Sequence, residues 1–485
     1  MSRMLFVAVV WLSSLPGLLA EGHTVKVTRH FNENPHWDGY RNRLLPEKLP
    51  IIRQYFGHQE SNHAGGGNPG EIGGTVQRSV TRAYYAKVIP GRTFHDKLAA
   101  SGKFAVTRAD GGSGVLIGWF HHTSRGWRTP NSIGFRIDGN GGNYRLFYEY
   151  GTSKWRTGGG GAFEGPRWQT TKTKPFQADG TIHQWSLAYD PDGNEKQGIM
   201  TFTLDGKTYP LPLSQSHKSD GANFNRFGIW NLQANGDRMD FYIDDLVLDG
   251  TPQDFSSDAG WEGVGNQVEF EERIIRPFHD FGYSQTNHTG GEPGELGGII
   301  YRDEKPAYYG AMVETLTLEN ELEATGKIAL TDAGSDSAFY LGWFNSATKM
   351  DNKIPEHKAR QKNYLAILVE GPSRVGHYFR PSYGTSTGEG LTAPHPVTRK
   401  EPPIIRPDGQ VHEWSMRYSP SEAGDKGQVR ITLDGKAHTL NLRPGDKARG
   451  AKFDRFGIFN MQSGGHHVRV YIDELTHTSK AKTGN

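Results

Sequence analysis

The sequence predicts an all-β protein made of two tandem β-sandwich domains. Its 485 residues are too many for one ordinary core, and they include 63 glycines, 26 prolines and many aromatic residues (24 Phe, 20 Tyr and 11 Trp). Turn formers and aromatics with few long apolar runs are typical of many short strands rather than helices. A set of motifs that occurs twice in the same order indicates that the second half of the chain repeats the first.

The repeated motifs run through both halves of the chain. They are W-D-G at Trp37 and W-E-G at Trp261, IGWF and LGWF, YGTS twice, TLDGK twice, RFGIWNLQ and RFGIFNMQ, and YIDDL and YIDEL. The copies are separated by 224 residues near the start of each half and by 229 residues near its end. A period this long indicates a duplicated domain rather than a solenoid. We expect a first domain at residues 21–250, a second at 255–478 and a C-terminal tail at 479–485.

Residues 1–20 predict a cleaved signal peptide. Arg3 precedes an apolar stretch too short to span a bilayer with its flanks, and Ala20 is a small residue suited to cleavage. No later stretch is long and apolar enough for a membrane helix. The sequence has no cysteine, which excludes disulfides and cysteine-zinc sites. We therefore expect a secreted, periplasmic or extracellular protein without a membrane span.

Alternation and turn residues predict the strands inside each half. In TIHQWSLAY every second residue falls on one face, in phase with tryptophan, so His183 and its counterpart His412 are expected to be structural. Asp205-Gly206 supplies the positive φ angles that a tight hairpin needs. The strands around Trp119 and Trp343 are apolar enough for both indoles to be core residues.

The order of the W-D/E-G strand, the H-x-W-S-x-x-Y strand, the TLDGK hairpin and the RFGI…YIDDL strands resembles the concanavalin A-like lectin/glucanase superfamily, including laminin-G-like sandwiches. The resemblance covers both halves. It implies two tandem concanavalin A-like β-sandwich (jelly-roll) domains whose concave sheets hold sugars. In similar sandwiches an aspartate of the closing strand helps to bind a structural Ca²⁺, which makes Asp244 and Asp473 candidate ligands. Such aspartates are more often plain turn residues, and a fold does not by itself establish a function.

A glycine-rich motif occurs once in each half, as FGHQESNHAGGGNPGEIGG and FGYSQTNHTGGEPGELGG. It places Asn62, His63 and Glu71 beside a constrained loop, and Arg78 and the pair Tyr84-Tyr85 follow. Amide, imidazole and guanidinium groups bind sugar hydroxyls or carboxylates, and tyrosine stacks on sugar rings. The same residues would equally serve the loop itself, with Asn62 and His63 holding it and Arg78 pairing with Glu71.

The two halves differ at several other polar positions. Arg136 and Tyr148 of the first half align with Leu368 and Pro381 of the second, and His121 and His122 align with Asn345 and Ser346. The first half therefore carries the richer set of sugar-binding residue types, and it is where we expect any chemistry. Surface drift would produce the same difference.

These residues bear on three classes of function. A formal charge of only +2 with mixed signs argues against nucleic acid as a partner. A retaining glucanase needs two carboxylates on one strand face, and the first half has no such run. A polysaccharide lyase needs groups that neutralise a uronate carboxylate and transfer protons, as Asn, Arg, His and Tyr do.

The sequence therefore predicts a protein that binds an extracellular polysaccharide and possesses residues suited to β-elimination. The candidate catalytic residues are His63, Tyr148, Arg136 and Asn62. The candidate substrate-binding residues are Arg78, Glu71, Tyr84, Tyr85, Tyr150, His121, His122, Asn287, His288 and Arg302. Three alternatives stay open: a non-catalytic tandem lectin-like protein, a glycoside hydrolase with an unrecognised carboxylate pair, and a structural envelope or adhesion protein. The oligomeric state is not predicted.

Overall fold

A computed structural model describes residues 24–162, 175–276, 278–348, 361–373, 375–394 and 403–480. The expected signal peptide and most of the expected tail lie outside these residues. The described chain is built of strands, with three four-residue helical turns, α1 (His217–Asp220), α2 (Glu422–Asp425) and α3 (Asp446–Arg449). None of the helices in the described ranges has the length and apolar character that crossing a membrane requires.

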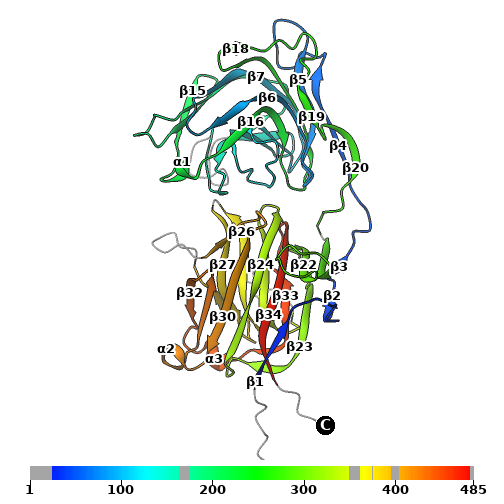
Figure 1. The fold of residues 1–485 in the computed structure, drawn as a ribbon. Helices are drawn as coiled ribbons and strands as arrows, with labels where there is room; N and C mark the ends of the chain where they lie inside the picture. The colour runs from blue at the N-terminus through cyan, green and yellow to red at the C-terminus, as the bar shows by residue number, and fades with distance from the viewer. Residues whose placement is uncertain are drawn as a thin grey trace, which may run out of the picture.

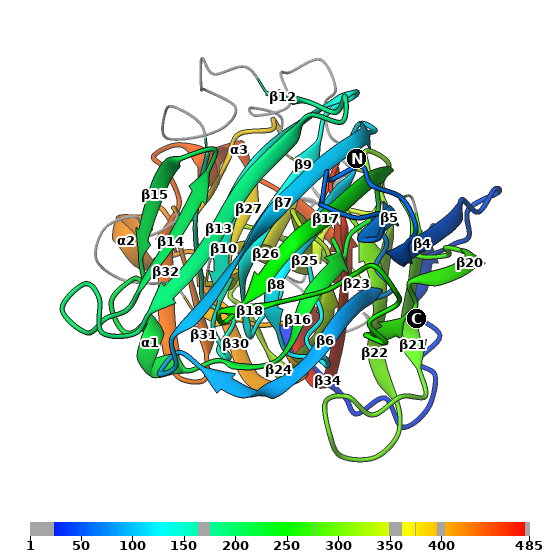
Figure 2. The ribbon, with the colours of Figure 1, turned by 90° about the horizontal axis from the view of Figure 1, so that it is seen from above.

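Domain 1 (residues 51–271) is a sandwich of two antiparallel sheets. The outer sheet has the order β15 (Lys207–Pro212), β14 (Ile199–Leu204), β13 (Ile182–Asp190), β7 (Leu98–Ala109), β17 (Arg238–Leu248), β5 (Glu71–Gln77), β4 (Ile51–Gln59) and β20 (Gln267–Glu271), with β18 (Thr251–Pro252) on β17. The inner sheet has the order β11 (Thr157–Gly161), β10 (Asn143–Gly151), β9 (Ser132–Gly139), β8 (Gly114–Phe120), β16 (Asn223–Asn231), β6 (Tyr84–Thr93) and β19 (Glu262–Val264), with β12 (Phe176–Gln177) on β10. The strands curve into an arch with β7 outside and β6 and β16 inside (Figure 1). Seen from above, β13, β7 and β17 lie over the inner sheet (Figure 2).

Domain 2 (residues 24–44 together with 279–480) repeats this strand order. Its nine-stranded sheet has the order β32 (Lys436–Asn441), β31 (Gln428–Leu433), β30 (Val411–Ser419), β24 (Leu322–Ala333), β34 (His467–Lys480), β22 (Glu295–Tyr301), β21 (His279–Ser284) and β3 (Arg43–Leu44), with β1 (Thr24–Arg29) on β34. Its eight-stranded sheet has the order β28 (Gly390–Thr392), β27 (Gly376–Gly384), β26 (Tyr364–Ser373), β25 (Ser337–Phe344), β33 (Lys452–Asn460), β23 (Tyr308–Thr317) and β2 (Asp38–Tyr40), with β29 (Ile404–Ile405) on β27. Each strand of one domain thus has a counterpart at the same place in the other. The expected fold class, two β-sandwich jelly-roll domains, is confirmed.

The strand pairing departs from the expected boundaries of 21–250 and 255–478. Residues 24–44, the N-terminal arm, pair with domain 2, at the far end of the chain: β1 pairs with β34, β2 with β23 and β3 with β21. Their counterparts β18, β19 and β20, which lie between residues 251 and 271, pair with domain 1. The blue arm beside the red final strand is visible in Figure 1. Domain 1 is therefore continuous in sequence, whereas domain 2 is closed by the first described residues of the chain.

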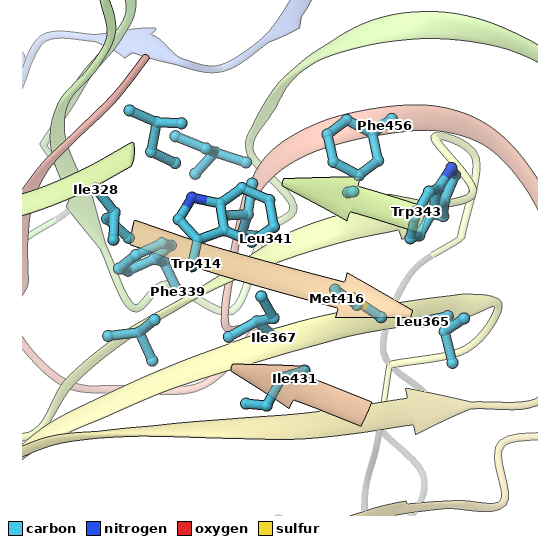
Figure 3. Packing of buried hydrophobic residues seen from close by; sticks show 14 of the residues in the cluster. Ile328, Phe339, Leu341, Trp343, Leu365, Ile367, Trp414, Met416, Ile431 and Phe456 are labelled. Carbon is cyan, nitrogen blue, oxygen red and sulfur yellow. The ribbon is translucent and has the colours of Figure 1, made fainter. Parts of the chain in front are cut away.

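Each domain has one main core between its two sheets. In domain 2, Phe339, Leu365, Trp414 and Ile431 are among the side chains that pack between the sheets (Figure 3). Burial of each such side chain contributes about 1.5–3 kcal/mol. Trp343 and, in domain 1, Trp119 have no exposed surface, which confirms the prediction that both are core residues.

Candidate functional site

The face of the inner sheet of domain 1 that points away from the core carries charged and aromatic groups. On β9, Ile133, Phe135 and Ile137 point into the core, so Arg136 and Asp138 point to the opposite face. Apolar side chains from β6, β8 and β16 form a second cluster on this face. Its members are Tyr84, Ala86, Leu116, Phe120, Trp230 and Leu232, with Trp127 and Val264 packed against it.

Arg136 is the centre of this arrangement, which we call the Arg136 face. Its Nε donates to Glu149 Oε2 at 3.3 Å, and its Nη1 donates to Asp138. The guanidinium carbon lies 4.6 Å from the ring centroid of Phe147 and 5.2 Å from that of Trp127. Burial alone would lower the pKa of Arg136, but Asp138 and Glu149 raise it above its ordinary value. The side chain therefore keeps a fixed positive charge between two carboxylates and two aromatic rings.

Arg78 joins the Arg136 face through the same indole. Its guanidinium carbon also lies 5.2 Å from the Trp127 centroid. Burial lowers the pKa of Arg78, Asp138 raises it and the neighbouring Arg136 lowers it further. Two of the expected site arginines are therefore brought together. Trp127, Asp138, Glu149 and Phe147 were missed. The alternation in SIGFRIDG signals that Asp138 shares a face with Arg136, whereas nothing in the sequence places the loop residue Trp127 there.

Domain 2 keeps an arginine–carboxylate pair at the corresponding place but takes the arginine from another strand. Glu370 occupies the position of Asp138, and Leu368 that of Arg136, as the sequence alignment implied. Arg380 of the adjacent strand β27 supplies the guanidinium, which bonds Glu370 and donates to Ala393 O at 3.0 Å. The first half therefore does not hold all of the charge on these sheets.

The repeated glycine-rich motif ties down a loop at the edge of the outer sheet. Glu71, which has no exposed surface, accepts hydrogen bonds from Ser61 Oγ (2.6 Å), His63 N (2.8 Å) and Ala64 N (2.7 Å). Asn62 Nδ2 donates to Gly66 O at 3.3 Å. This is the structural role that the sequence left open. The expected pairing of Arg78 with Glu71 does not occur, because the two residues lie at opposite ends of β5 and the carboxylate is taken by the loop.

The second copy of the motif is built in the same way. Glu295 accepts from Thr286 Oγ1 (2.6 Å), His288 N (2.9 Å) and Thr289 N (3.0 Å), and Asn287 Nδ2 donates to Gly291 O at 2.7 Å. Each histidine ring packs on a tyrosine of the neighbouring strand. The centroids are 4.3 Å apart for His63 and Tyr242, and 4.0 Å apart for His288 and Tyr471.

The structure does not bring the four expected catalytic residues together. Asn62 and His63 lie at the edge of the outer sheet. Of the four, Arg136 alone lies on the outward face of the inner sheet. Tyr148 has the same parity on β10 as Leu146 and points into the core, where it stacks on Phe202 at 5.8 Å.

The remaining expected ligands of a sugar have structural partners. Tyr150 accepts from Ser214 N at 2.9 Å and lies 3.0 Å from His217 Nδ1. Tyr85 donates to Asp258 at 2.9 Å. The Arg82 guanidinium lies over the ring of Tyr84, 5.5 Å from its centroid. Side-chain hydrogen bonds of 2.8 Å join His122 to Asn225, His121 to Thr123 and Arg302 to Ser463.

The candidate calcium ligands Asp244 and Asp473 are buried next to the glycine-rich loops. In each, Oδ1 accepts the N–H of the following residue at 2.7 Å. A Cβ on Gly66 would lie 1.7 Å from Asp244 Oδ2, so the carboxylate packs on the loop backbone. Burial raises the pKa of Asp473 to about 6. The described residues hold no cluster of three or more His, Cys, Asp or Glu side chains suited to a metal, so any Ca²⁺ here would need backbone carbonyls as well.

We expect Ca²⁺ to stabilise the protein through these two aspartates. At 10 mM Ca²⁺ and a dissociation constant of 0.1–1 mM, the gain is about 1.4–2.7 kcal/mol for each site. The measurement is thermal unfolding in Ca²⁺ and in EDTA for the wild type and for Asp473→Asn, which retains the acceptor for the N–H of Glu474. Equal melting temperatures of the wild type in both buffers would contradict the calcium site.

Comparisons with known proteins show likeness in fold alone. No protein-family model matches the chain, and no curated protein matches it. Among solved structures, domains LG4-5 of the mouse laminin α1 chain are 10% identical over 90% of this chain and 94% of that chain, with a TM-score of 0.25. The PL7 alginate lyase AlyA5 from Zobellia galactanivorans is 12% identical over 42% of this chain and 89% of that chain, with a TM-score of 0.26. The carbohydrate recognition domain of Emp47p is 10% identical over 41% and 88%, with a TM-score of 0.24. TM-scores this low say nothing about function, so the function is inferred from the residues of the Arg136 face.

Proposed function

We propose that this protein is a secreted polysaccharide-binding protein and that the sugar chain lies on the Arg136 face of domain 1. The observation that carries the proposal is the group formed by Arg136, Asp138, Glu149 and Trp127 outside the core. Guanidinium and carboxylate groups hydrogen-bond to sugar hydroxyls, and an indole packs on the apolar face of a sugar ring. Arg136 is only 8% exposed, and burying a charge is costly even when it is paired, so its presence on this face favours a functional role over a purely structural one.

Binding without cleavage is the activity that the described residues support best. Elimination from the expected set would require His63 and Tyr148 to reach one sugar, but they lie in different parts of the sandwich. Arg136 bonds both carboxylates of the Arg136 face, so neither is the unpaired acid that glycoside hydrolysis requires.

The test is a glycan panel of neutral, uronate and sulfated polysaccharides measured with the wild type, Trp127→Ala and Tyr55→Ala. Tyr55 is an exposed aromatic residue on the outer sheet of the same domain, 63% exposed, and it serves as the matched control. We expect Trp127→Ala to weaken binding about three- to tenfold, because an aromatic contact contributes about 0.5–1.5 kcal/mol. Tyr55→Ala should bind as the wild type does.

Two further readings of the same mixtures separate binding from catalysis. Absorbance near 235 nm reports unsaturated uronate products, and released reducing ends report hydrolysis. We expect neither signal. A glycan that the wild type retains and that both variants retain equally would place the binding site elsewhere, and a product signal would show that the protein is an enzyme.

A further inference from the structure

The two sandwiches meet end to end where the chain passes from domain 1 to domain 2. Tyr301 Oη, at the end of β22, lies 2.7 Å from Asn235 Oδ1 of domain 1 and 2.8 Å from Ile274 O of the linker. Asn235 Nδ2 donates to the same Ile274 carbonyl at 2.6 Å. These contacts join domain 1, the linker and domain 2 at one point and fix their relative position locally.

Four basic side chains converge beside this junction, and we call them the interdomain seam: Arg78 of domain 1, Arg276 of the linker, and Arg302 and His466 of domain 2. The three arginines all act electrostatically on His466. Glycines allow the close approach, because a Cβ on Gly464 would lie 2.8 Å from Arg276 Nη1 and one on Gly236 would lie 2.9 Å from Arg78 Nε.

The charges of the interdomain seam are only partly neutralised by the described residues. Arg302 pairs with Asp336 at 2.5 Å and donates to Ser463 Oγ at 2.8 Å. Among the described residues, the guanidinium groups of Arg78 and Arg276 form neither an ion pair nor a hydrogen bond, and Arg78 Nε is buried without a partner. Burial and the neighbouring arginines lower the pKa of His466 to about 4, so the imidazole is neutral at pH 7. Within the described part of the chain, therefore, no carboxylate forms an ion pair with Arg78 or Arg276, although Asp138 and Asp237 act on Arg78 from farther away.

We propose that the interdomain seam is a binding site for an anionic group, a carboxylate or a sulfate, of the polysaccharide chain that occupies the Arg136 face. The proposal rests on the proposed function and makes the ligand an acidic polysaccharide held by both domains. Arginine is well suited to this role because its planar donors match carboxylate and sulfate oxygens in pairs.

Arg78 belongs both to the Arg136 face and to the interdomain seam. Trp127 contacts both Arg136 and Arg78, and Arg78 in turn acts on His466 of domain 2. In the proposed complex, a sugar chain packed against Trp127 extends past Arg78 toward the linker residue Arg276. Such a chain bridges two domains, which explains why a cation of each domain and one of the linker meet at this place.

The test compares Arg276→Gln with Arg273→Gln. Both arginines are exposed on the same linker, and only Arg276 belongs to the interdomain seam. Affinities for oligouronate, sulfated and neutral oligosaccharides are measured by calorimetry at low and high salt. We expect Arg276→Gln to weaken binding of anionic oligosaccharides roughly five- to tenfold at low salt, to have a smaller effect at high salt, and to leave neutral ones unchanged. A loss with uronate alone or with sulfate alone identifies which anion the site takes. Arg273→Gln should match the wild type.

A sugar-free arm separates failure of this inference from failure of the proposed function. Inorganic sulfate is titrated while the imidazole signals of His466 are followed by NMR, and we expect a saturable shift that Arg276→Gln weakens. Equal behaviour of the two arginine variants with anionic sugars, with no effect of sulfate on His466, would overturn the interdomain seam as a site. In that case a loss of binding in Trp127→Ala would still support the Arg136 face. A sulfate response without any effect of Trp127→Ala on sugar binding would support the interdomain seam as an anion site and contradict the Arg136 face as the sugar site.

Discussion

Replacing Phe31 with alanine is expected to destabilise domain 2, at the far end of the chain, by about 3–5 kcal/mol and to leave domain 1 unchanged. Phe31 lies in the N-terminal arm, is 4% exposed and belongs to the core of domain 2. Its ring packs edge-on against Trp37 at 5.3 Å, and Trp37 in turn lies 5.9 Å from Tyr309 of β23. Removing the ring leaves a cavity between the arm and the domain that it closes.

The matched variant is Phe255→Ala, at the corresponding place between β18 and β19. Phe255 is 1% exposed and belongs to the core of domain 1, with Trp261 at 5.5 Å. Hydrogen exchange read by mass spectrometry reports the free energy of opening of each domain separately. Phe31→Ala should speed exchange in β24 and β34, and Phe255→Ala in β7 and β17. Faster exchange of domain 1 in Phe31→Ala and of domain 2 in Phe255→Ala would contradict the strand pairing, because each phenylalanine would then pack on the domain that follows it directly in the sequence.

Replacing Glu71 with alanine is expected to cost about 3 kcal/mol or more of the stability of domain 1. The substitution removes three hydrogen bonds to a carboxylate and leaves the buried N–H of Ala64 and the partly buried N–H of His63 without an acceptor. Glu71→Gln keeps one acceptor oxygen and should cost less. Denaturant unfolding of the three proteins, with the midpoint and slope fitted together, measures the difference.

The control for this prediction is His63→Ala. Only the backbone N–H of His63 bonds to Glu71, so removal of the imidazole should cost less than about 1 kcal/mol. Binding to any glycan of the panel should also be unchanged. A large loss of binding with unchanged stability in His63→Ala would instead support the sugar-binding interpretation of the motif.

Local patterns predicted the strands well because they depend on neighbours in sequence. Asp205 and Gly206 have φ angles of 47° and 80° and join β14 to β15 as a tight hairpin. His183 is a structural residue, as expected, with Nδ1 2.7 Å from Asp205 Oδ2, and His412 repeats the contact with Asp434 at 2.6 Å.

The face of a strand was harder to predict than the strand itself. Tyr148 and Arg136 lie on adjacent strands and were assigned to one site, but the pairing of β9 with β10 sets Tyr148 opposite Phe135, a core residue. The register between strands, which decides the face, is not contained in either strand alone. Trp127 was missed for a related reason, since only the folded loop brings it to Arg136.

The sequence could not reveal that the N-terminal arm and its counterpart, residues 251–271 (the second arm), each pair with the other domain than expected. Both arms carry the same tryptophan, the same acid–glycine pair and the same asparagine, so each fits either domain. Asn42 Nδ2 bonds Phe281 O at 2.6 Å, and Asn266 Nδ2 bonds Phe56 O at 2.6 Å. Because both arms bind through the same contacts, the domain with which each arm pairs depends on how the chain connects the two domains. A local sequence pattern does not contain that information.

The N-terminal arm also has a consequence for the order in which the two domains fold during synthesis. Thr24 pairs with Lys480, so the first strand to leave the ribosome is among the last to find its partner. Domain 1 is complete by residue 271 and can fold while the rest of the chain is still being made. Its own pairing of Ile51 with Glu271 then holds the two strands that lead to domain 2 side by side, and Leu44 pairs with His279 just beyond them. A folded domain 1 thereby shortens the loop that the pairing of Leu44 with His279 closes, from about half of the chain to a few residues on either side of the paired strands β4 and β20.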